Sequence, residues 1–181
     1  RLCGNTFEIS AHSFYQVNHD MAERLYEKAL ELADIGPGDR VADLYCGIGT
    51  IAITAAKKVS NAEIVGVEIV PQAVENAKKN AAINQLDNVS FYCADADHPS
   101  LQNSRIILVD PPRKGLSPGL IQSIQKAAPE RLVYISCAPD TLARDCRLLA
   151  EAGYRADEIY PFDMFPRTGH IECVTLLTRG Q

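Results

Sequence analysis

VADLYCGIGT, residues 41–50, sets the architecture that we expect for this chain. It reads as a short apolar strand from Val41, a turn at Gly47 and Gly49, and the start of a helix at Thr50. Glycine accepts positive φ angles and lets a ligand approach the backbone closely. A strand, a glycine turn and a helix N-terminus together form a nucleotide-type cradle. The spacing Gly47-x-Gly49-x-x-Ala52 also fits a looser dinucleotide fingerprint, so this stretch alone leaves the cofactor open.

The composition is that of an ordinary globular domain. The chain has 181 residues, of which 46% are hydrophobic and 23% charged, with a net charge of -5. No apolar run approaches the roughly 20 residues of a membrane helix, so we expect no membrane association. The acidic balance argues against a surface that is basic throughout, although a local cationic patch could still bind nucleic acid. Because the chain opens on Arg1 instead of Met, we expect a fragment of a longer protein.

The six cysteines contain no CxxC pair, which argues against a zinc site and predicts no bound metal. No secretion signal precedes them. We therefore expect reduced thiols in a cytoplasmic protein.

Strand-like and helix-like segments alternate along most of the chain, which predicts an α/β fold with a doubly wound, mostly parallel sheet of seven strands. The last two strands are joined only by the loop around PRTGHIE, so the final strand should run antiparallel. The expected strands are 41–45, 64–68, 89–93, 106–110, 132–136, 158–162 and 173–178. The expected helices are 50–58, 71–84, 118–128 and 139–152.

Residues 1–36 are predicted to precede this catalytic domain, which we place at 37–181. Alternating apolar residues up to the aromatic pair Phe14 and Tyr15 indicate a strand or hairpin. A leading helix then follows, capped by Asn18 and ending near Ile35.

Three carboxylates stand at or just beyond predicted strand ends, where parallel sheets of this kind bind ligands. Glu68 closes the second strand and is placed to accept hydrogen bonds from ribose hydroxyls. Asp95 follows the third strand and could accept a hydrogen bond from an adenine amino group; a loop acid that caps a turn explains it nearly as well. Asp110 opens the sequence DPPRKG and should face the glycine turn. The alternative for Glu68 is a solvated acid at a strand end, and the alternative for Asp110 is that the two prolines after it simply end the strand.

Cys137 and Glu172 are the candidate catalytic residues. Cys137 directly follows the fifth strand, and the N-terminus of the helix at Pro139 can lower the pKa of its thiol. A buried structural cysteine explains the local sequence equally well. Glu172 enters an apolar strand, which is costly unless the acid is paired or functional, so it could be a general base with a raised pKa. His170 points to the same face on an extended chain and is the alternative base.

Together these motifs resemble the RNA uracil-5-methyltransferases, over nearly the whole chain. The combination is specific, whereas the glycine turn alone is not. The segments that carry the resemblance are FYQVN at 14–18, DLYCGIGT at 43–50, VGVE at 65–68, DPPR at 110–113, SCAPDTLARD at 136–145 and DMFPRTGHIE at 163–172.

The resemblance implies a class I methyltransferase fold, S-adenosylmethionine as the cofactor and 5-methyluridine as the product. Cys137 matches the family's nucleophile and Glu172 its base. The cofactor-binding residues implied by the match are Gln16, Tyr45, Gly47, Gly49, Thr50, Glu68, Asp95 and Asp110.

The family also has an RNA-binding barrel and a β-subdomain that this sequence does not contain. We therefore expect a monomer that binds its RNA substrate mainly through parts outside this chain. Ribosomal RNA is favoured over transfer RNA as that substrate.

Two alternatives of other classes remain. A nicotinamide-dependent oxidoreductase could use the same glycine turn, but Asp43 before the turn, the DPPR motif and the lack of a hydride-transfer His or Tyr site argue against it. A cofactor-binding module without catalysis would have no need of both Cys137 and Glu172. Among methyltransferases, an amino-methylating enzyme would need no cysteine.

Overall fold

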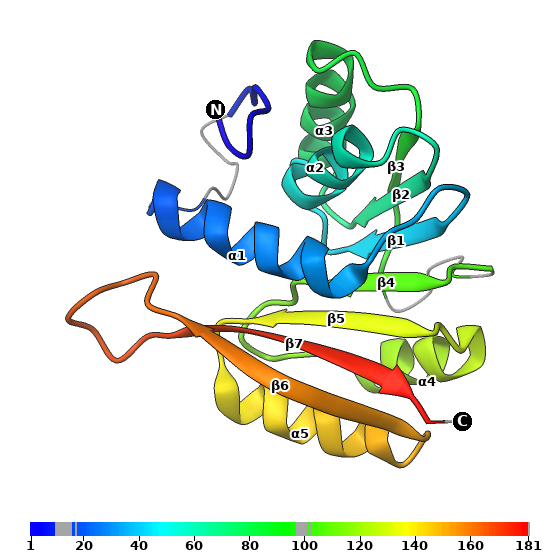
Figure 1. The fold of residues 1–181 in the computed structure, drawn as a ribbon, viewed down its shortest axis with the longest axis vertical. Coiled ribbons are helices and arrows are strands. Elements are labelled where there is room, and N and C mark those ends of the chain that lie inside the picture. The colour runs from blue at the N-terminus through cyan, green and yellow to red at the C-terminus, as the bar shows by residue number, and fades with distance from the viewer. Residues whose placement is uncertain (10–15, 17, 97–100, 102, 181) are drawn as a thin grey trace.

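The computed structural model describes residues 1–9, 16, 18–96, 101 and 103–180, and its described strands form one seven-stranded sheet (Figure 1). The strand order is β3-β2-β1-β4-β5-β7-β6. Only β7 runs antiparallel to its neighbours, which confirms the predicted fold class. The strands are β1 (Arg40–Leu44), β2 (Glu63–Glu68), β3 (Val89–Cys93), β4 (Ile106–Val109), β5 (Arg131–Ser136), β6 (Tyr154–Phe162) and β7 (Glu172–Arg179).

Five helices flank the sheet in the described part of the chain. Proline occupies the first turn of the helices that start at Pro71, Pro118 and Pro139, as the sequence predicts. The side chains of Asn18 and Ser117 cap two of the helices, and the helix at Thr50 starts with neither device. In α1 the side chain of Asn18 accepts from the N–H of Met21 at 3.3 Å. The helices are α1 (His19–Ala33), α2 (Thr50–Lys58), α3 (Pro71–Ile83), α4 (Pro118–Ala127) and α5 (Pro139–Ala150).

The helices cover both faces of the sheet, and each face has its own hydrophobic core. Helices α1, α2 and α3 pack on one face, and α4 and α5 pack on the other (Figure 1). Successive residues of β4 alternate between the two cores: Ile106 and Leu108 belong to the first, and Ile107 and Val109 to the second. Because β4 is apolar on both faces, it reads as an uninterrupted hydrophobic run and takes a central place in the sheet.

Two predicted segments differ from the structure. Strand β6 begins at Tyr154 instead of Glu158, because charged residues are tolerated along an exposed edge strand. Residues 1–9 form a turn closed by a bridge between Leu2 and Asn5 and not the expected strand. Phe14 and Tyr15, which belonged to the same prediction, lie outside the described residues. In the described part of the chain, no helix has the length and apolarity required to cross a bilayer.

Helix α1 packs against β5 and β7 and contributes Leu25 to the same core as the sheet. The division of the chain at residue 36 stays a prediction.

Candidate active site

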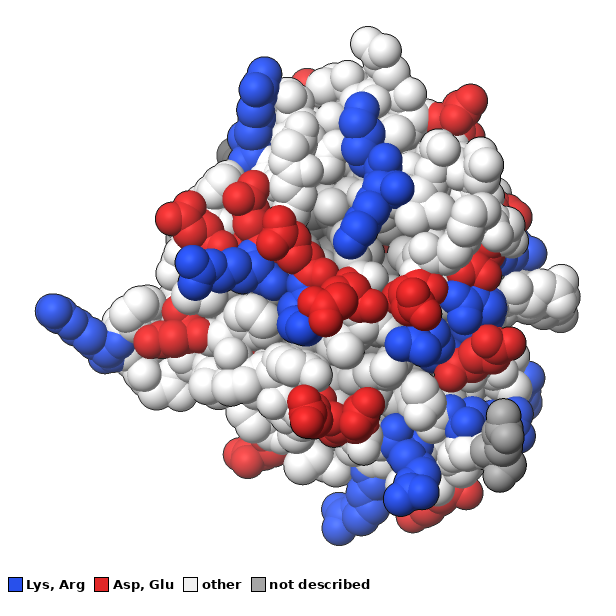
Figure 2. All heavy atoms as spheres, in the orientation of Figure 1, with Lys and Arg blue, Asp and Glu red and all other residues white. Residues whose placement is uncertain are grey.

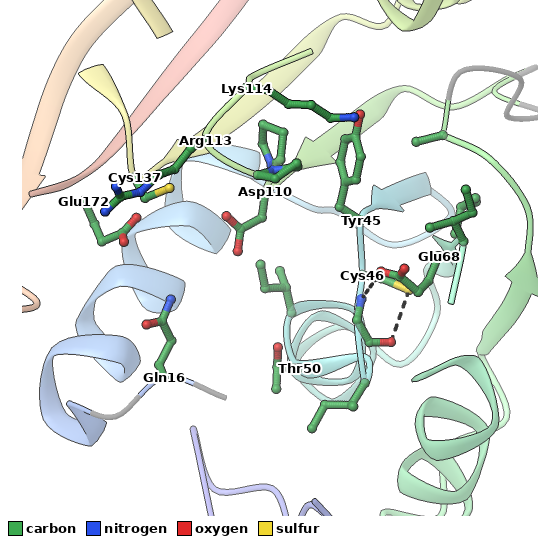
Figure 3. Close-up of a pocket in the computed structure, with 18 of the residues that line it drawn as sticks. Gln16, Tyr45, Cys46, Thr50, Glu68, Asp110, Arg113, Lys114, Cys137 and Glu172 are labelled. Carbon is green, nitrogen blue, oxygen red and sulfur yellow. Dashed lines mark hydrogen bonds between the residues drawn. The ribbon is translucent and has the colours of Figure 1, made fainter. Parts of the chain in front are cut away.

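A cavity of about 670 Å³ opens at the edge of the sheet where β1, β2, β4 and β5 end and β7 begins. Figure 3 shows side chains from all these elements pointing into it. Nine of the ten residues singled out in the sequence line the cavity: Gln16, Tyr45, Gly47, Thr50, Glu68, Asp95, Asp110, Cys137 and Glu172.

Gly49 is the predicted site residue that does not line the cavity. A Cβ atom at this position would lie 2.7 Å from the ring of Phe91, and the backbone has a φ of 85°. Glycine is required here because α2 starts against β3 with a left-handed cap, and not because a ligand needs the space.

The carboxylate of Glu68, at the end of β2, fixes the glycine turn that follows β1 through a hydrogen bond. Gly47 has a φ of 56°, and its N–H donates to Oε2 of Glu68 at 3.1 Å. The other oxygen of Glu68 accepts from the N–H of Val70 at 3.0 Å. Each carboxylate oxygen has two lone-pair sites, so Glu68 can fix the turn and still accept a hydrogen bond from a ligand.

Two side chains from the N-terminal part of the chain complete the cavity (Figure 3 labels Gln16). Gln16 is 7% exposed, and its Oε1 accepts no hydrogen bond within the described residues. Tyr26 of α1 is buried and lines the same cavity. No sequence pattern singles out Tyr26, since it follows Leu25 in an ordinary amphipathic helix.

Strand register brings Cys137 and Glu172 together. Ser136 at the end of β5 pairs with Cys173 in β7, so the next residue of β5 lies beside the preceding residue of β7. Figure 3 shows the Cys137 thiol, the Glu172 carboxylate and the Arg113 guanidinium side by side at one end of the cavity. A thiol and a carboxylate that are 35 positions apart become neighbours only because β7 runs antiparallel.

The surroundings of Glu172 suit a general base. Burial raises the pKa of Glu172 to about 7, and the nearby Arg113 opposes this shift. A carboxyl group with a pKa near neutrality can accept and release a proton at physiological pH.

The N-terminus of α5 does not lower the pKa of the Cys137 thiol. Burial raises this pKa, and the carboxylates of Glu172 and Asp110 raise it further, while Arg113 acts in the opposite direction. The start of α5 does not compensate, because desolvation and two negative charges both disfavour the thiolate. The positive charge of Arg113 therefore favours the thiolate, the reactive form of Cys137.

Asp110 lines the cavity, and a second acid, Asp43, lies buried in β1 outside the cavity lining. Burial raises the pKa of Asp43 to about 8 and that of Asp110 to about 7. Asp43 accepts from the N–H of Ala52 at 3.0 Å through Oδ2, and its Oδ1 has no hydrogen-bond partner among the described residues. Neighbouring carboxylates in a dry site favour a ligand that carries positive charge.

His170 is not placed to act as a base. Its Nδ1 lies 3.0 Å from Nη2 of Arg113, and its ring meets the edge of Phe165. Because a guanidinium has only donors, Nδ1 must be the acceptor, and its lone pair is already engaged. His170 therefore orients Arg113, which in turn faces Glu172.

The carboxylates of Glu68 and Asp110 line the cavity, and Oε1 of Gln16 has no partner among the described residues; these groups fit a polar, positively charged cofactor such as S-adenosylmethionine.

Comparison with known proteins identifies the family of the chain. Residues 35–153 match the sequence family described as a methyltransferase domain. The oxidoreductase alternative is therefore wrong.

Relatives with similar sequences are longer than this chain. An uncharacterized RNA methyltransferase from Streptococcus mutans is 46% identical over 185 residues, which cover 99% of this chain and 41% of that protein. One from Bacillus cereus is 46% identical over 179 residues, which cover 96% and 38%. The chain thus spans about two fifths of the curated relatives that it matches.

A solved structure of the Pyrococcus abyssi tRNA (uracil-54, C5)-methyltransferase in complex with S-adenosyl-L-homocysteine superposes with a TM-score of 0.89. It is 37% identical and covers 98% of this chain and 43% of its own. The family and the fold confirm the prediction of S-adenosylmethionine as the cofactor. The chain belongs to the methyltransferase domain family and has the class I S-adenosylmethionine-dependent fold.

Proposed function

We propose that this chain is the catalytic part of an RNA methyltransferase that forms 5-methyluridine through a transient covalent bond between Cys137 and the uracil ring. The observation that carries the proposal is the thiol–carboxylate pair at one end of the cofactor cavity. The names of the sequence relatives support an RNA substrate, and the Pyrococcus structure supports carbon 5 of a uracil. We favour ribosomal RNA over transfer RNA as the substrate.

We propose a role for four of the cofactor-binding residues. Glu68 would accept from ribose hydroxyls beside the glycine turn, and Asp95 would accept from the adenine amino group. Gln16 would direct its unpaired Oε1, and Asp110 its carboxylate, toward the polar, charged end of the cofactor. When bound, S-adenosylmethionine supplies an electrophilic methyl group on a positively charged sulfur.

Cys137 supplies the activation that this chemistry needs, because carbon 5 of uracil is a poor nucleophile. The thiolate forms a bond to carbon 6, and the electrons of the 5,6 double bond move to carbon 5 and the adjacent carbonyl. Carbon 5 is then electron-rich enough to take up a methyl group. Arg113, close to both Cys137 and Glu172, favours the thiolate at the start of this sequence.

Glu172 completes the reaction. Its carboxylate removes the proton from carbon 5, the 5,6 double bond reforms, and the thiolate of Cys137 leaves carbon 6. The proton ends on Glu172, whose pKa of about 7 allows its release to solvent. Because the two residues lie inside a cavity, the target uridine must leave its base stack to reach them.

The charged surface gives RNA only local contacts. On the face shown in Figure 2, Lys and Arg side chains are interspersed with Asp and Glu. The net charge of -5 leaves RNA affinity to small groups such as Arg113 and Lys114 at the cavity. We therefore propose that most of the RNA-binding surface belongs to other parts of the protein.

The proposal is tested on RNA from cells that lack the gene encoding this chain. Ribosomal and transfer RNA are purified separately, digested and analysed by mass spectrometry. We expect one 5-methyluridine to disappear from ribosomal RNA and to return when the unsubstituted gene is restored, but not when it encodes Cys137→Ala. Loss from transfer RNA alone would change the substrate, and unchanged 5-methyluridine in both would refute the proposal.

A further inference from the structure

Helix α3 carries asparagines at three positions spaced four residues apart, Asn76, Asn80 and Asn84 at its C-cap. Residues four apart share one face of a helix, so this face is polar where a packed helix is normally apolar. Asn76 is 3% exposed and Asn80 is 0% exposed. A buried amide is costly unless it is hydrogen-bonded, so the partners of these side chains reveal what the stripe does.

Two of these asparagines hold residues 1–9, which we call the N-terminal strap. Oδ1 of Asn84 accepts from the N–H of Thr6 at 3.0 Å, and its Nδ2 donates to the Thr6 carbonyl at 2.8 Å. Oδ1 of Asn80 accepts from the N–H of Glu8 at 2.7 Å, and its Nδ2 donates to the Glu8 carbonyl at 3.4 Å. The two amides thus pair with alternate residues of the strap, as the backbone of a neighbouring strand would.

Asn80 makes one contact that Asn84 does not make. Its Nδ2 also donates to the carbonyl of Ile48 at 3.2 Å. Ile48 lies in the glycine turn and lines the cofactor cavity, and the preceding Gly47 donates to Glu68. The turn is therefore held on one side by Glu68 and on the other by Asn80.

We propose that Asn80 is a positioning residue for the cofactor. Its side chain couples the N-terminal strap to the glycine turn through the hydrogen bond to the carbonyl of Ile48. The inference rests on S-adenosylmethionine as the cofactor and not on the identity of the RNA. Without this bond the Ile48 carbonyl loses its buried hydrogen-bond donor, and the backbone of the turn becomes more mobile. Cofactor binding must then order the turn, which lowers the affinity.

Asn84 supplies the matched control, because its removal loosens the strap and leaves the bond to Ile48 in place. Binding of S-adenosyl-L-homocysteine to Asn80→Ala and Asn84→Ala is measured by isothermal titration calorimetry. We expect the Kd to rise about fivefold in Asn80→Ala, as one net hydrogen bond implies, and to stay within about twofold in Asn84→Ala. Should Asn80→Ala fail to fold, Asn80→Ser takes its place, since its hydroxyl is too short to reach Ile48 while a polar group is kept.

Amide hydrogen exchange of the turn separates positioning from general destabilisation. The amides of Ile48 and Gly49 should exchange faster in the Asn80 variant than in the Asn84 variant, even where both variants unfold at the same urea concentration. Equal effects of the two variants on Kd and exchange, or no effect of either, would overturn the role of Asn80. If the unsubstituted chain binds no S-adenosyl-L-homocysteine, the cofactor assignment fails, and this inference fails with it.

Discussion

Replacing Glu172 with glutamine should separate the formation of the RNA adduct from its release. The amide keeps the size of the side chain and cannot take the proton from carbon 5. Cys137 can still add to the ring, and the methyl group can still be transferred. We therefore expect a methylated protein–RNA adduct to accumulate in Glu172→Gln.

The size of the effect follows from the environment of Glu172. Loss of a general base typically slows a step by about 10²–10⁴-fold, and we expect adduct release to slow by at least the lower figure. In the unsubstituted enzyme a pKa of about 7 leaves the carboxylate mostly protonated at pH 6 and mostly ionised at pH 8. The release rate should therefore rise about tenfold across this range in the unsubstituted enzyme and stay flat in the variant.

The assay follows end-labelled RNA in single-turnover reactions of the full-length protein at pH 6, 7 and 8. Samples are quenched over time, and the covalent complex is measured on denaturing gels. Glu151→Gln is the control, because Glu151 is exposed at the end of α5 and the substitution removes the same charge. We expect this control to release its RNA at the normal rate.

Normal release by Glu172→Gln, with no trapped adduct, would refute the assignment of Glu172 as the base. A release rate that rises with pH in the variant as in the unsubstituted enzyme would show that the titrating group is another residue.

Four further outcomes are expected. Cys137→Ala should abolish both methyl transfer and the covalent adduct on a denaturing gel, and an adduct that persists would place the nucleophile on another cysteine. Glu68→Ala should weaken binding of S-adenosyl-L-homocysteine by about 1–3 kcal/mol, the range of a hydrogen bond to a charged group, as calorimetry can measure. Burial raises the pKa of Asp43 to about 8 from its usual value near 4, so the folded chain keeps a proton that the unfolded chain loses. The free energy of unfolding should therefore fall as the pH rises from 6 to 8. Urea denaturation should show a flatter pH dependence of this free energy in Asp43→Asn. RNA binding by the isolated chain should be weak and fall steeply with salt in a filter-binding titration, because it depends on local contacts such as Arg113 and Lys114, and tight binding that salt does not change would contradict this.

The order of strands and helices could be predicted from the sequence because it depends on local signals. Apolar runs, prolines in first helical turns and the glycine turn each act over a few residues. The antiparallel β7 was also predictable, since nine residues between Phe162 and Glu172 leave no room for a helical crossover. Less predictable was the start of β6, whose charged residues resemble a loop until its place at the edge of the sheet is known.

The site residues were predicted in part from their places at strand ends and in part from resemblance to a family. The sequence places Cys137 and Glu172 at the same edge of the sheet. It does not show that they lie beside each other and beside Arg113, because neighbours across the sheet follow from strand register. Tyr26 could not be found, because nothing in the pattern of α1 shows which of its buried residues meets the cavity.

Local sequence was sufficient to determine the fold and the strand edge where ligands bind, since both depend on periodicity and on short turns. Tertiary structure alone decided the electrostatics and the supports of the site. The raised pKa of Cys137 reflects burial and the charges of residues remote in the chain, which outweigh a local helix terminus. Likewise, the ring of Phe91 makes Gly49 necessary, and Asn80 finds its partners in Glu8 and Ile48, because packing brings together segments that no local pattern connects.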